Sequence, residues 1–185
     1  MSTVTQEKDY GHVPVLLHEC LDALAIKPDG IYVDGTLGRA GHSLEIVKRL
    51  TTGRLIGIDR DETAIAAAQE RLADYRDRVT LVHSNFDRIG DILADLHIDG
   101  ADGMLFDLGV SSPQLDDAER GFSYMHDAPL DMRMDRTAYL TAREVVNSWS
   151  YEELRRILFE YGEERYAPAI AKRIVQHREP VSYTH

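Results

Sequence analysis

Residues 31–43 read IYVDGTLGRAGHS, and this stretch decides the fold class. An apolar, β-branched run ends in Asp34, glycines follow at every third position, and the apolar residues then take up helical spacing. A glycine-rich turn between a strand and a helix is typical of ligand loops in α/β domains. The pattern therefore predicts a ligand at this turn, which could be a nucleotide phosphate, a dinucleotide or a sulfonium cofactor.

The following residues repeat the alternation of strand and helix. Further strands are expected at 54–59, 79–85 and 101–109, and helices at 42–50, 61–75 and 86–96. Apolar strands that alternate with helices predict an α/β fold whose parallel sheet is covered on both faces. Four strands make only half of a doubly wound sheet. We therefore expect the chain to be the N-terminal portion of a longer protein, with an incomplete sheet.

The pattern changes after Gly109. Residues 110–136 show no sustained period, and a long irregular stretch of this kind is usually functional or disordered. Its aromatic and basic residues suggest a lid or a platform for a base, namely Phe122, Tyr124, Arg120 and Arg133. The alternative is that these aromatics only pack between the domain and the insert. Helices should follow from residue 137, with capping boxes at Thr141/Glu144 and Ser150/Glu153 and with Pro168 in the first turn of a third helix. The predicted domains are residues 1–112 and 113–185.

Composition limits the function classes. The 185 residues carry a net charge of −11, which argues against unspecific binding to a phosphate backbone. A local basic surface could still face RNA, and the candidate residues are Arg155, Arg156, Arg165, Lys172, Arg173 and Arg178. No apolar run is long enough to span a membrane, and the single cysteine, Cys20, suits a reducing cytoplasm. The histidines are dispersed, so no metal site is expected.

The residues of the glycine turn discriminate among its ligands. A P-loop needs a lysine before its Ser or Thr, and RAGHS has none. Gly35, Gly38 and Gly41, with Asp59 at the end of the second strand, suit either NAD or S-adenosylmethionine, since both carry an adenosine ribose. Asp34 would repel a pyrophosphate but stabilise a sulfonium or an ammonium group. S-adenosylmethionine is favoured, and an NAD-linked oxidoreductase is the weaker alternative.

Four side chains stand where predicted strands end: Asp34, Asp59, Phe86 and Asp107. Ligands of open α/β sheets bind outside the carboxyl ends of the strands. A single aspartate in such a place is more often a turn former, but four successive positions favour a site. Phe86 could pack on the adenine, and Asp107 lies where the reactive end of the cofactor and the acceptor should meet.

Several motifs resemble one family. They are HVPVLLHE (12–19), DGTLGRAGHS (34–43), IGIDRD (56–61), SNFD (84–87), DLGVSSPQLDDAERGFSYMHDAPLDMRMD (107–135) and YGEER (161–165). Together they resemble the MraW/RsmH family, bacterial methyltransferases that modify N4 of a cytidine in 16S ribosomal RNA. The resemblance extends from His12 to about Arg178.

The resemblance implies a class I (Rossmann-like) methyltransferase domain with a helical domain inserted after the fourth strand. It implies S-adenosylmethionine as the cofactor, held by Ala40, Gly41 and His42 in the loop, Asp59 at the ribose, Phe86 at the adenine, and Asp107 with Gln114. The chain departs from the family at Ala40, where a glycine is usual. If this position has positive φ, alanine costs about 1 kcal/mol or more.

The implied reaction transfers a methyl group to a cytidine amine of 16S rRNA within the small ribosomal subunit. Asp107 is the first candidate to accept the amine proton, with Ser111 and Ser112 as helpers. The alternative is a truncated, catalytically inert module that binds the cofactor or the ribosome. The expected location is cytoplasmic, and a homodimer is a further candidate assembly.

Overall fold

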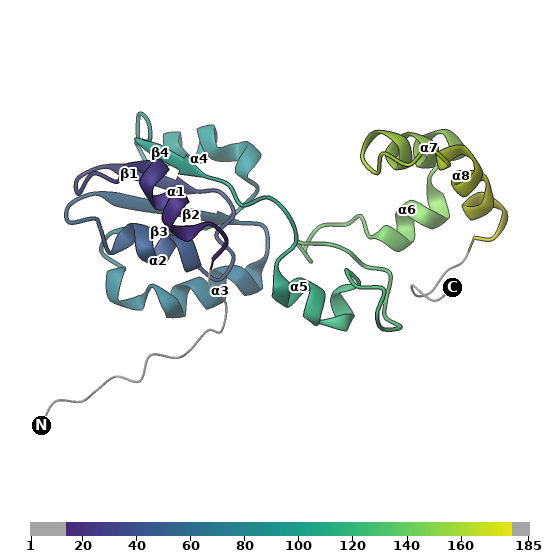
Figure 1. Ribbon diagram of the computed structural model, residues 1–185, viewed down its shortest axis with the longest axis horizontal. Helices are drawn as coiled ribbons and strands as arrows, with labels where there is room; N and C mark the ends of the chain where they lie inside the picture. Colours follow the sequence, from purple (N-terminus) through teal and green to yellow (C-terminus); the bar gives the residue numbers. More distant parts are fainter. Residues whose placement is uncertain (1–13, 179–185) are drawn as a thin grey trace, which may run out of the picture. The chain divides into compact units, whose positions relative to one another are not determined.

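The computed structural model describes residues 14–178. The chain divides into two compact units, the first ending at Leu108 and the second beginning at Gly109 (Figure 1). The beginning of the HVPVLLHE motif, His12 and Val13, lies outside the described residues.

The first unit is built on a parallel sheet. Its strands are β1 (Ile31–Asp34), β2 (Arg54–Asp59), β3 (Val79–His83) and β4 (Gly103–Leu105). All of the pairings are parallel, and the strand order is β3-β2-β1-β4. The predicted α/β fold with a parallel sheet is therefore confirmed.

Helices cover both faces of this sheet, as Figure 1 shows. On one face, Tyr32 and Leu55 pack against residues of α1 (Leu17–Leu24), α2 (Gly41–Val47) and α3 (Glu62–Arg71). On the other face, Val33, Ile56 and Ile58 pack against α4 (Ile89–Asp95). Successive side chains of a strand point to opposite faces, so the apolar runs of β1 and β2 are buried on both sides.

Two strands are shorter than predicted. β3 ends at His83, and Phe86 begins the 3₁₀ helix η2 (Phe86–Arg88). β4 ends at Leu105, and the N–H of Asp107 donates to a side chain, Thr36 Oγ1, rather than to a neighbouring strand. The apolar pattern could not reveal the end of β4, because it continues past the last strand residue into Phe106. The helix predicted at 61–75 is also divided, into α3 and η1 (Ala73–Tyr75).

The second unit is helical. The capping boxes predicted for α6 (Ala142–Ser148) and α7 (Tyr151–Glu160) are confirmed, and α8 (Ala167–Gln176) has a proline in its first turn. Leu154, Ala167 and Ala171 are buried where α7 packs on α8. The irregular stretch 110–136 also contains α5 (Ser112–Asp116) and η3 (Ala118–Arg120), which have too few residues for a periodic signal.

Two arginines hold the irregular stretch together. Arg120 is buried, and its guanidinium donates to the carbonyls of Arg133 (3.1 Å) and Met134 (3.0 Å). Arg133 forms a bidentate pair with Asp131, at 2.9 and 2.6 Å. These guanidinium groups organise the chain locally. Both guanidinium groups are thus engaged within the stretch, and its role as a lid or a platform for a base stays a prediction.

None of the helices within residues 14–178 is long and apolar enough to cross a membrane.

Two glycines of the first unit provide a matched test of its packing. A Cβ on Gly53, just before β2, would lie 2.2 Å from the carbonyl oxygen of Gly30, whereas a Cβ on Gly90 in α4 would meet nothing within 4 Å. Gly53→Ala should lower the free energy of unfolding by roughly 1–3 kcal/mol, because backbone must move. Gly90→Ala should raise it by about 0.5 kcal/mol through helix propensity. Urea denaturation measures both, and equal effects would contradict the packing.

Candidate functional site

The candidate site lies at the carboxyl edge of the sheet. From β1 the chain adds β2 and β3 on one side and then returns to add β4 on the other. The connections leaving β1 and β4 therefore diverge, and ligands of open α/β sheets bind at such a switch point. The loop 35–40, between β1 and α2, begins there.

The loop after β1 is bonded to both neighbouring strands. The N–H of Gly35 donates to the carbonyl of Leu105 at 2.9 Å, and that of Leu37 donates to the carbonyl of Ile58 at 3.0 Å. Gly38 has a φ of 50°, and its N–H donates to Asp59 Oδ2 at 2.8 Å. The glycine at position 38 is thus required by a left-handed turn that directs its amide at the carboxylate.

Ala40 has the positive φ that would favour glycine. It stands before α2 with φ 57° and ψ 35°, and it is fully buried. The left-handed conformation costs about 1–2 kcal/mol for a residue with a Cβ. Burial of the methyl group offsets about 0.8 kcal/mol of this. The departure from the family pattern therefore has a net cost of about 1 kcal/mol or less. The next residue, Gly41, is close to Pro14, whose Cγ would lie 2.5 Å from an added Cβ.

Asp34 is only 2% exposed. Its Oδ2 accepts a hydrogen bond from Ser43 Oγ at 2.7 Å, and its Oδ1 accepts one from the N–H of Thr36 at 3.2 Å. Desolvation by burial raises the pKa of this carboxyl, although the hydrogen bonds from Ser43 and Thr36 oppose the shift. The carboxyl thus connects the loop to α2. From the sequence, we expected Asp34 to contact a cationic group of the ligand. In the structure, its carboxyl oxygens accept hydrogen bonds from protein groups.

Asp59 has a different environment. It is half-buried at the end of β2, and its oxygens accept from the N–H groups of Gly38 (2.8 Å) and Asp61 (2.9 Å). A carboxylate offers about four acceptor positions, so two backbone donors leave capacity for further hydrogen bonds. Asp59 can therefore order the loop and still accept bonds from ligand hydroxyls.

Asp107 combines an anchored backbone with a free side chain. Its N–H donates to Thr36 Oγ1 at 2.6 Å, while its carboxylate is exposed and has no hydrogen-bond or ion-pair partner within residues 14–178. Thr36 in turn donates its own N–H to Asp34. Thr36 was not identified from the sequence. The feature that could have indicated Thr36 in the sequence is its hydroxyl group, which stands within a glycine-rich loop.

Two phenylalanines form an aromatic pair at the same edge. The rings of Phe86 and Phe106 meet edge to face at 70°, with centroids 5.6 Å apart. They are 37% and 42% exposed, so apolar faces remain open to a flat ligand. Gly35 permits the close approach, because a Cβ there would lie 2.4 Å from Phe106 Cε1. Phe106 was missed because it reads as an ordinary residue of an apolar strand.

The remaining predicted residues have structural contacts. The buried ring of His42 donates through Nε2 to the carbonyl of Val15 at 2.9 Å, which connects α2 to the segment before α1. Ser111, Ser112 and Gln114 belong to the second unit. Within it, the side-chain carbonyl of the buried Gln114 accepts from the N–H of Ser111 at 3.0 Å, at the start of α5.

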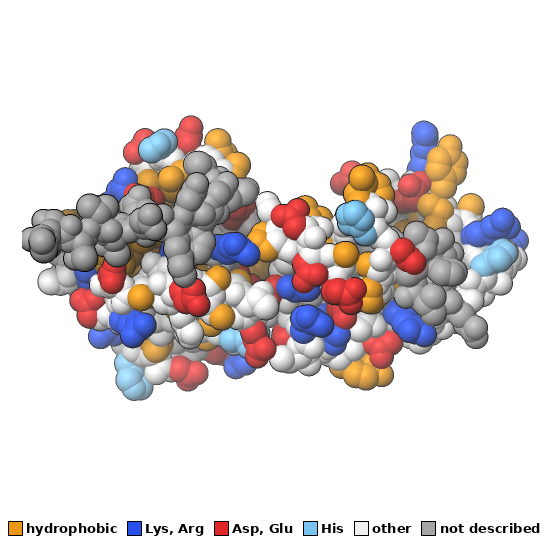
Figure 2. Space-filling model, turned by 90° about the horizontal axis from the view of Figure 1, so that it is seen from below, with side chains coloured by type: hydrophobic (Ala, Val, Ile, Leu, Met, Phe, Trp, Pro, Cys, Tyr) orange, Lys and Arg blue, Asp and Glu red, His pale blue; other side chains and the backbone are white. Residues whose placement is uncertain are grey.

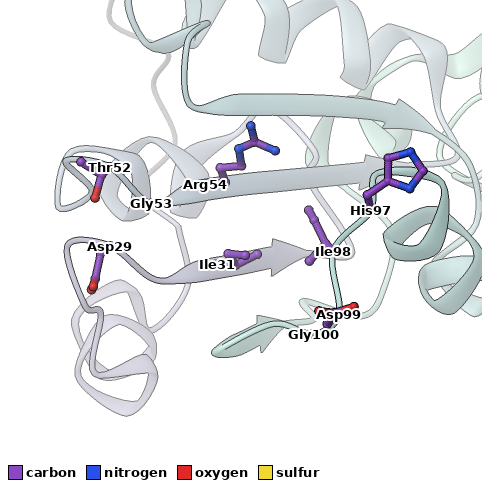
Figure 3. A pocket seen from close by; sticks show the side chains of 9 residues that line it. All are labelled: Asp29, Ile31, Thr52, Gly53, Arg54, His97, Ile98, Asp99 and Gly100. Carbon is purple, nitrogen blue, oxygen red and sulfur yellow. The ribbon is translucent and has the colours of Figure 1, made fainter.

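An open pocket of about 420 Å³ lies at the other edge of the sheet. Figure 3 shows its lining at the starts of the strands, where Ile31 begins β1 and Arg54 begins β2. The amino ends of parallel strands are not where ligands of open α/β sheets bind. This pocket and the expected ligand site therefore lie at opposite edges of the sheet. We place the candidate site at the carboxyl edge, because the geometry there fits the rule for open α/β sheets.

Charge is distributed without one dominant sign on the face seen in Figure 2, where acidic and basic side chains are interspersed over both units. Among residues 14–178, no group of three or more His, Cys, Asp or Glu side chains could hold a metal ion.

Comparisons with known proteins converge on one family. The model of the MraW methylase family matches residues 9–185. The chain is 57% identical over 178 residues to ribosomal RNA small subunit methyltransferase H of Brevibacillus brevis, covering 95% of this chain and 57% of that protein. Identity to the protein of the same name from Symbiobacterium thermophilum is 55% over 170 residues, covering 91% and 54%. The chain thus spans little more than half the length of these curated relatives.

A solved structure of an rRNA methylase from Streptococcus thermophilus is also similar. It is 20% identical, the match covers 44% of this chain and 49% of that one, and the TM-score is 0.38. A score of this size adds no argument to the sequence matches.

The buried carboxyl of Asp34 predicts a specific pH dependence. Because its folded-state pKa is raised, the folded protein binds more protons than the unfolded chain above the ordinary value of 3.8. Stability from this group is therefore lost as pH rises from about 4 through the raised pKa. Asp34→Asn removes that loss, so the unfolding free energy of the variant minus that of the wild type should increase with pH. Urea denaturation from pH 4 to 8 tests this, and a flat or falling difference would contradict it.

The bond between Thr36 and Asp107 can be tested by hydrogen exchange. Thr36→Val keeps the shape of the side chain but removes the acceptor, so the Asp107 amide should exchange roughly tenfold faster. Thr36→Ser retains the hydroxyl and should preserve the protection. Unchanged exchange in the valine variant would show that this bond does not hold the segment.

Proposed function

The chain belongs to the MraW methylase family, and on this premise we propose that it carries the cofactor-binding part of an S-adenosylmethionine-dependent rRNA methyltransferase. Its substrate is N4 of a cytidine in the 16S rRNA of the small ribosomal subunit, and it acts in the cytoplasm. The family match over residues 9–185 is the observation that carries the proposal. The names of the two relatives, ribosomal RNA small subunit methyltransferase H, support the substrate class.

The domain assignment follows from the same premise. The first unit is a class I (Rossmann-like) methyltransferase domain, of which this chain contains the strands β1 to β4. The helices of the second unit, within residues 113–185, are the inserted domain that recognises the substrate. The sheet order β3-β2-β1-β4, with the glycine loop directly after β1, supports the first assignment.

The donor set at the carboxyl edge suits S-adenosylmethionine. Asp59 has acceptor positions left for the ribose hydroxyls, and Phe86 offers an apolar face to the adenine. The loop of Gly38, Ala40, Gly41 and His42 contributes its backbone, and Gln114 remains a cofactor residue by the resemblance to the family alone. The buried Asp34 acts indirectly, by connecting this loop to α2 through Ser43.

Asp107 is the residue that we assign to the chemistry. When bound, S-adenosylmethionine supplies an electrophilic methyl carbon on a cationic sulfur. A cytidine amine is a weak nucleophile, so the protein must position it and provide an acceptor for its proton. The exposed carboxylate of Asp107 accepts a hydrogen bond from the amine and then takes the proton as the N–C bond forms and the C–S bond breaks. Ser111 and Ser112 assist in positioning.

The helical unit provides the surface for RNA. The target base must leave its stack to reach the site. Exposed basic side chains of α7, α8 and the turn between them can contact phosphates, and they are Arg155, Arg156, Arg165, Lys172 and Arg173. Arg178 is not included in this surface, because its guanidinium donates to the carbonyl of Trp149. The acidic total charge is compatible with this assignment because only the contact surface must be basic.

Cofactor binding tests the role of Asp59. Asp59→Ala removes the acceptor and should weaken the affinity for S-adenosylhomocysteine at least about tenfold, since hydrogen bonds to a charged group contribute roughly 1.5–3 kcal/mol. Asp95→Ala, an exposed acid at the end of α4, is the control and should bind like the wild type. Isothermal titration calorimetry measures the affinities, and the melting temperature of each variant reports whether it is folded. Wild-type affinity in folded Asp59→Ala would refute the assignment.

Methyl transfer itself is tested with small ribosomal subunits from a strain that lacks the modification. Incubation with S-adenosylmethionine labelled in its methyl group should place the label on N4 of one cytidine. A chain that binds S-adenosylhomocysteine but labels no RNA, beside an active full-length relative, would instead be the inert binding module. Binding of NAD alone would refute the proposal.

A further inference from the structure

The most exposed aromatic rings within residues 14–178 belong to the second unit, and three of them gather where α7 ends. Phe159 is 63% exposed, Tyr161 77% and Tyr166 60%, whereas the most exposed described ring of the first unit, Phe106, reaches 42%. We call Phe159, Tyr161 and Tyr166 the aromatic turn. Burial of apolar surface is favourable, so large rings that stay in water at one place usually mark a surface for a partner.

The helices α7 and α8 do not need these rings for their own packing. Leu154, Ala167 and Ala171 are buried where the two helices meet. Small and aliphatic side chains therefore make this core, and the three aromatic side chains lie outside it.

The backbone of the aromatic turn is held by hydrogen bonds. The N–H of Tyr161 donates to the carbonyl of Ile157 at 3.0 Å. The N–H of Glu164 donates to the carbonyl of Leu158, also at 3.0 Å, and the side chain of Glu164 accepts from the N–H of Tyr166 at 2.7 Å. The two tyrosines are thus fixed in their backbone before a partner binds, which lowers the entropic cost of binding.

An arginine stands beside each tyrosine of the aromatic turn. Arg156 Cζ lies 5.8 Å from the centroid of the Tyr161 ring, and Arg165 Cζ lies 5.0 Å from that of Tyr166. A guanidinium at such a distance makes a cation–π contact with the ring, and at these exposures the rings still present surface to solvent. Unpaired bases of RNA stack on aromatic rings and on guanidinium planes, and this part of the chain offers both.

Charge alone would hold RNA only weakly at this place. Residues 151–178 carry six Lys and Arg and five Glu, which gives a net charge of +1. Arg156 is moreover paired with Glu160 at 2.9 Å. Binding through phosphates needs a larger positive excess. An RNA partner would therefore be held largely by its bases, and only a single strand leaves the faces of its bases open.

We infer that the aromatic turn is a stacking surface for unpaired bases of the RNA substrate, on which Tyr161 and Tyr166 each hold one base. Phe159 extends this surface along α7, where Arg155 lies one helical turn before it. The inference rests on the proposed function, since it takes RNA as the partner of the second unit.

Fluorescence anisotropy with a short fluorescein-labelled single-stranded RNA tests the inference. Tyr161→Ala and Tyr166→Ala should each weaken binding about tenfold, because each removes the stacking of one base. Tyr161→Phe and Tyr166→Phe keep the ring and should keep the affinity. Tyr139→Ala is the matched control, because Tyr139 is a similarly exposed tyrosine of the second unit outside the aromatic turn. It should bind like the wild type, and the melting temperature of each variant reports whether it is folded.

The dependence on salt separates stacking from the attraction of charges. The loss of affinity in Tyr161→Ala should be the same at low and at high salt, because stacking releases no counterions. Arg155→Gln should lose affinity mainly at low salt. The same RNA annealed to its complement should bind the wild type at least about tenfold more weakly, since its base faces are covered.

Wild-type affinity in both folded alanine variants, or an equal loss in Tyr139→Ala, would overturn the inference. Alanine variants that keep their affinity for the RNA but lose it for small ribosomal subunits would also overturn it, since the aromatic turn would then bind a protein. Isothermal titration calorimetry with S-adenosylhomocysteine should give wild-type affinity for all of these variants. A wild type that binds this compound but no single-stranded RNA would overturn the inference alone, and if it binds neither, the proposed function fails as well.

Discussion

The hydrogen bond from the amide of Gly38 to the carboxylate of Asp59 joins the loop after β1 to the end of β2, at 2.8 Å. Much of the candidate site depends on it. The turn that produces this bond needs a positive φ at residue 38, and the next residues must then turn into α2. The same carboxylate holds the N–H of Asp61, from which α3 begins. The side chain of Asp59 therefore holds the loop and the start of α3, and its remaining acceptor positions are open to a ligand.

A second set of contacts connects this loop to the opposite side of the switch point. Asp34 is buried under the loop and accepts from Ser43 and Thr36, and the hydroxyl of Thr36 then holds the backbone of Asp107. Burial raises the pKa of Asp34 because it disfavours the charged form of this carboxyl. Its two hydrogen bonds offset part of that cost. The strained φ of Ala40 adds a further unfavourable contribution. Such contributions are tolerated where the surrounding core is well packed, as it is around Leu55 and Ile46.

These contacts also explain how β4 can end early while the backbone groups beyond it remain hydrogen-bonded. β4 stops at Leu105, yet the N–H groups of Gly35 and Asp107 both find acceptors across the gap between β1 and β4. Backbone groups at a strand end must be paired or hydrated. Here the pairing leaves the side chains of Phe106 and Asp107 exposed at the edge. The edge thus combines a hydrogen-bonded backbone with accessible side chains, which suits ligand binding.

Sequence alone determined the α/β class, the parallel sheet, both capping boxes and the family, because each depends on periodicity or on local motifs that survive without knowledge of contacts. It also identified Asp34, Asp59, Phe86 and Asp107 as residues near strand ends. Only the tertiary structure decided what these side chains do. Burial removes Asp34 from direct contact with solvent, and the bond to Thr36 anchors Asp107. The internal use of Arg120 and Arg133 and the pairing of Phe86 with Phe106 were equally invisible in the sequence. Each of these depends on residues distant in the chain or on the exact local turn, and hydrophobic periodicity carries no information about either.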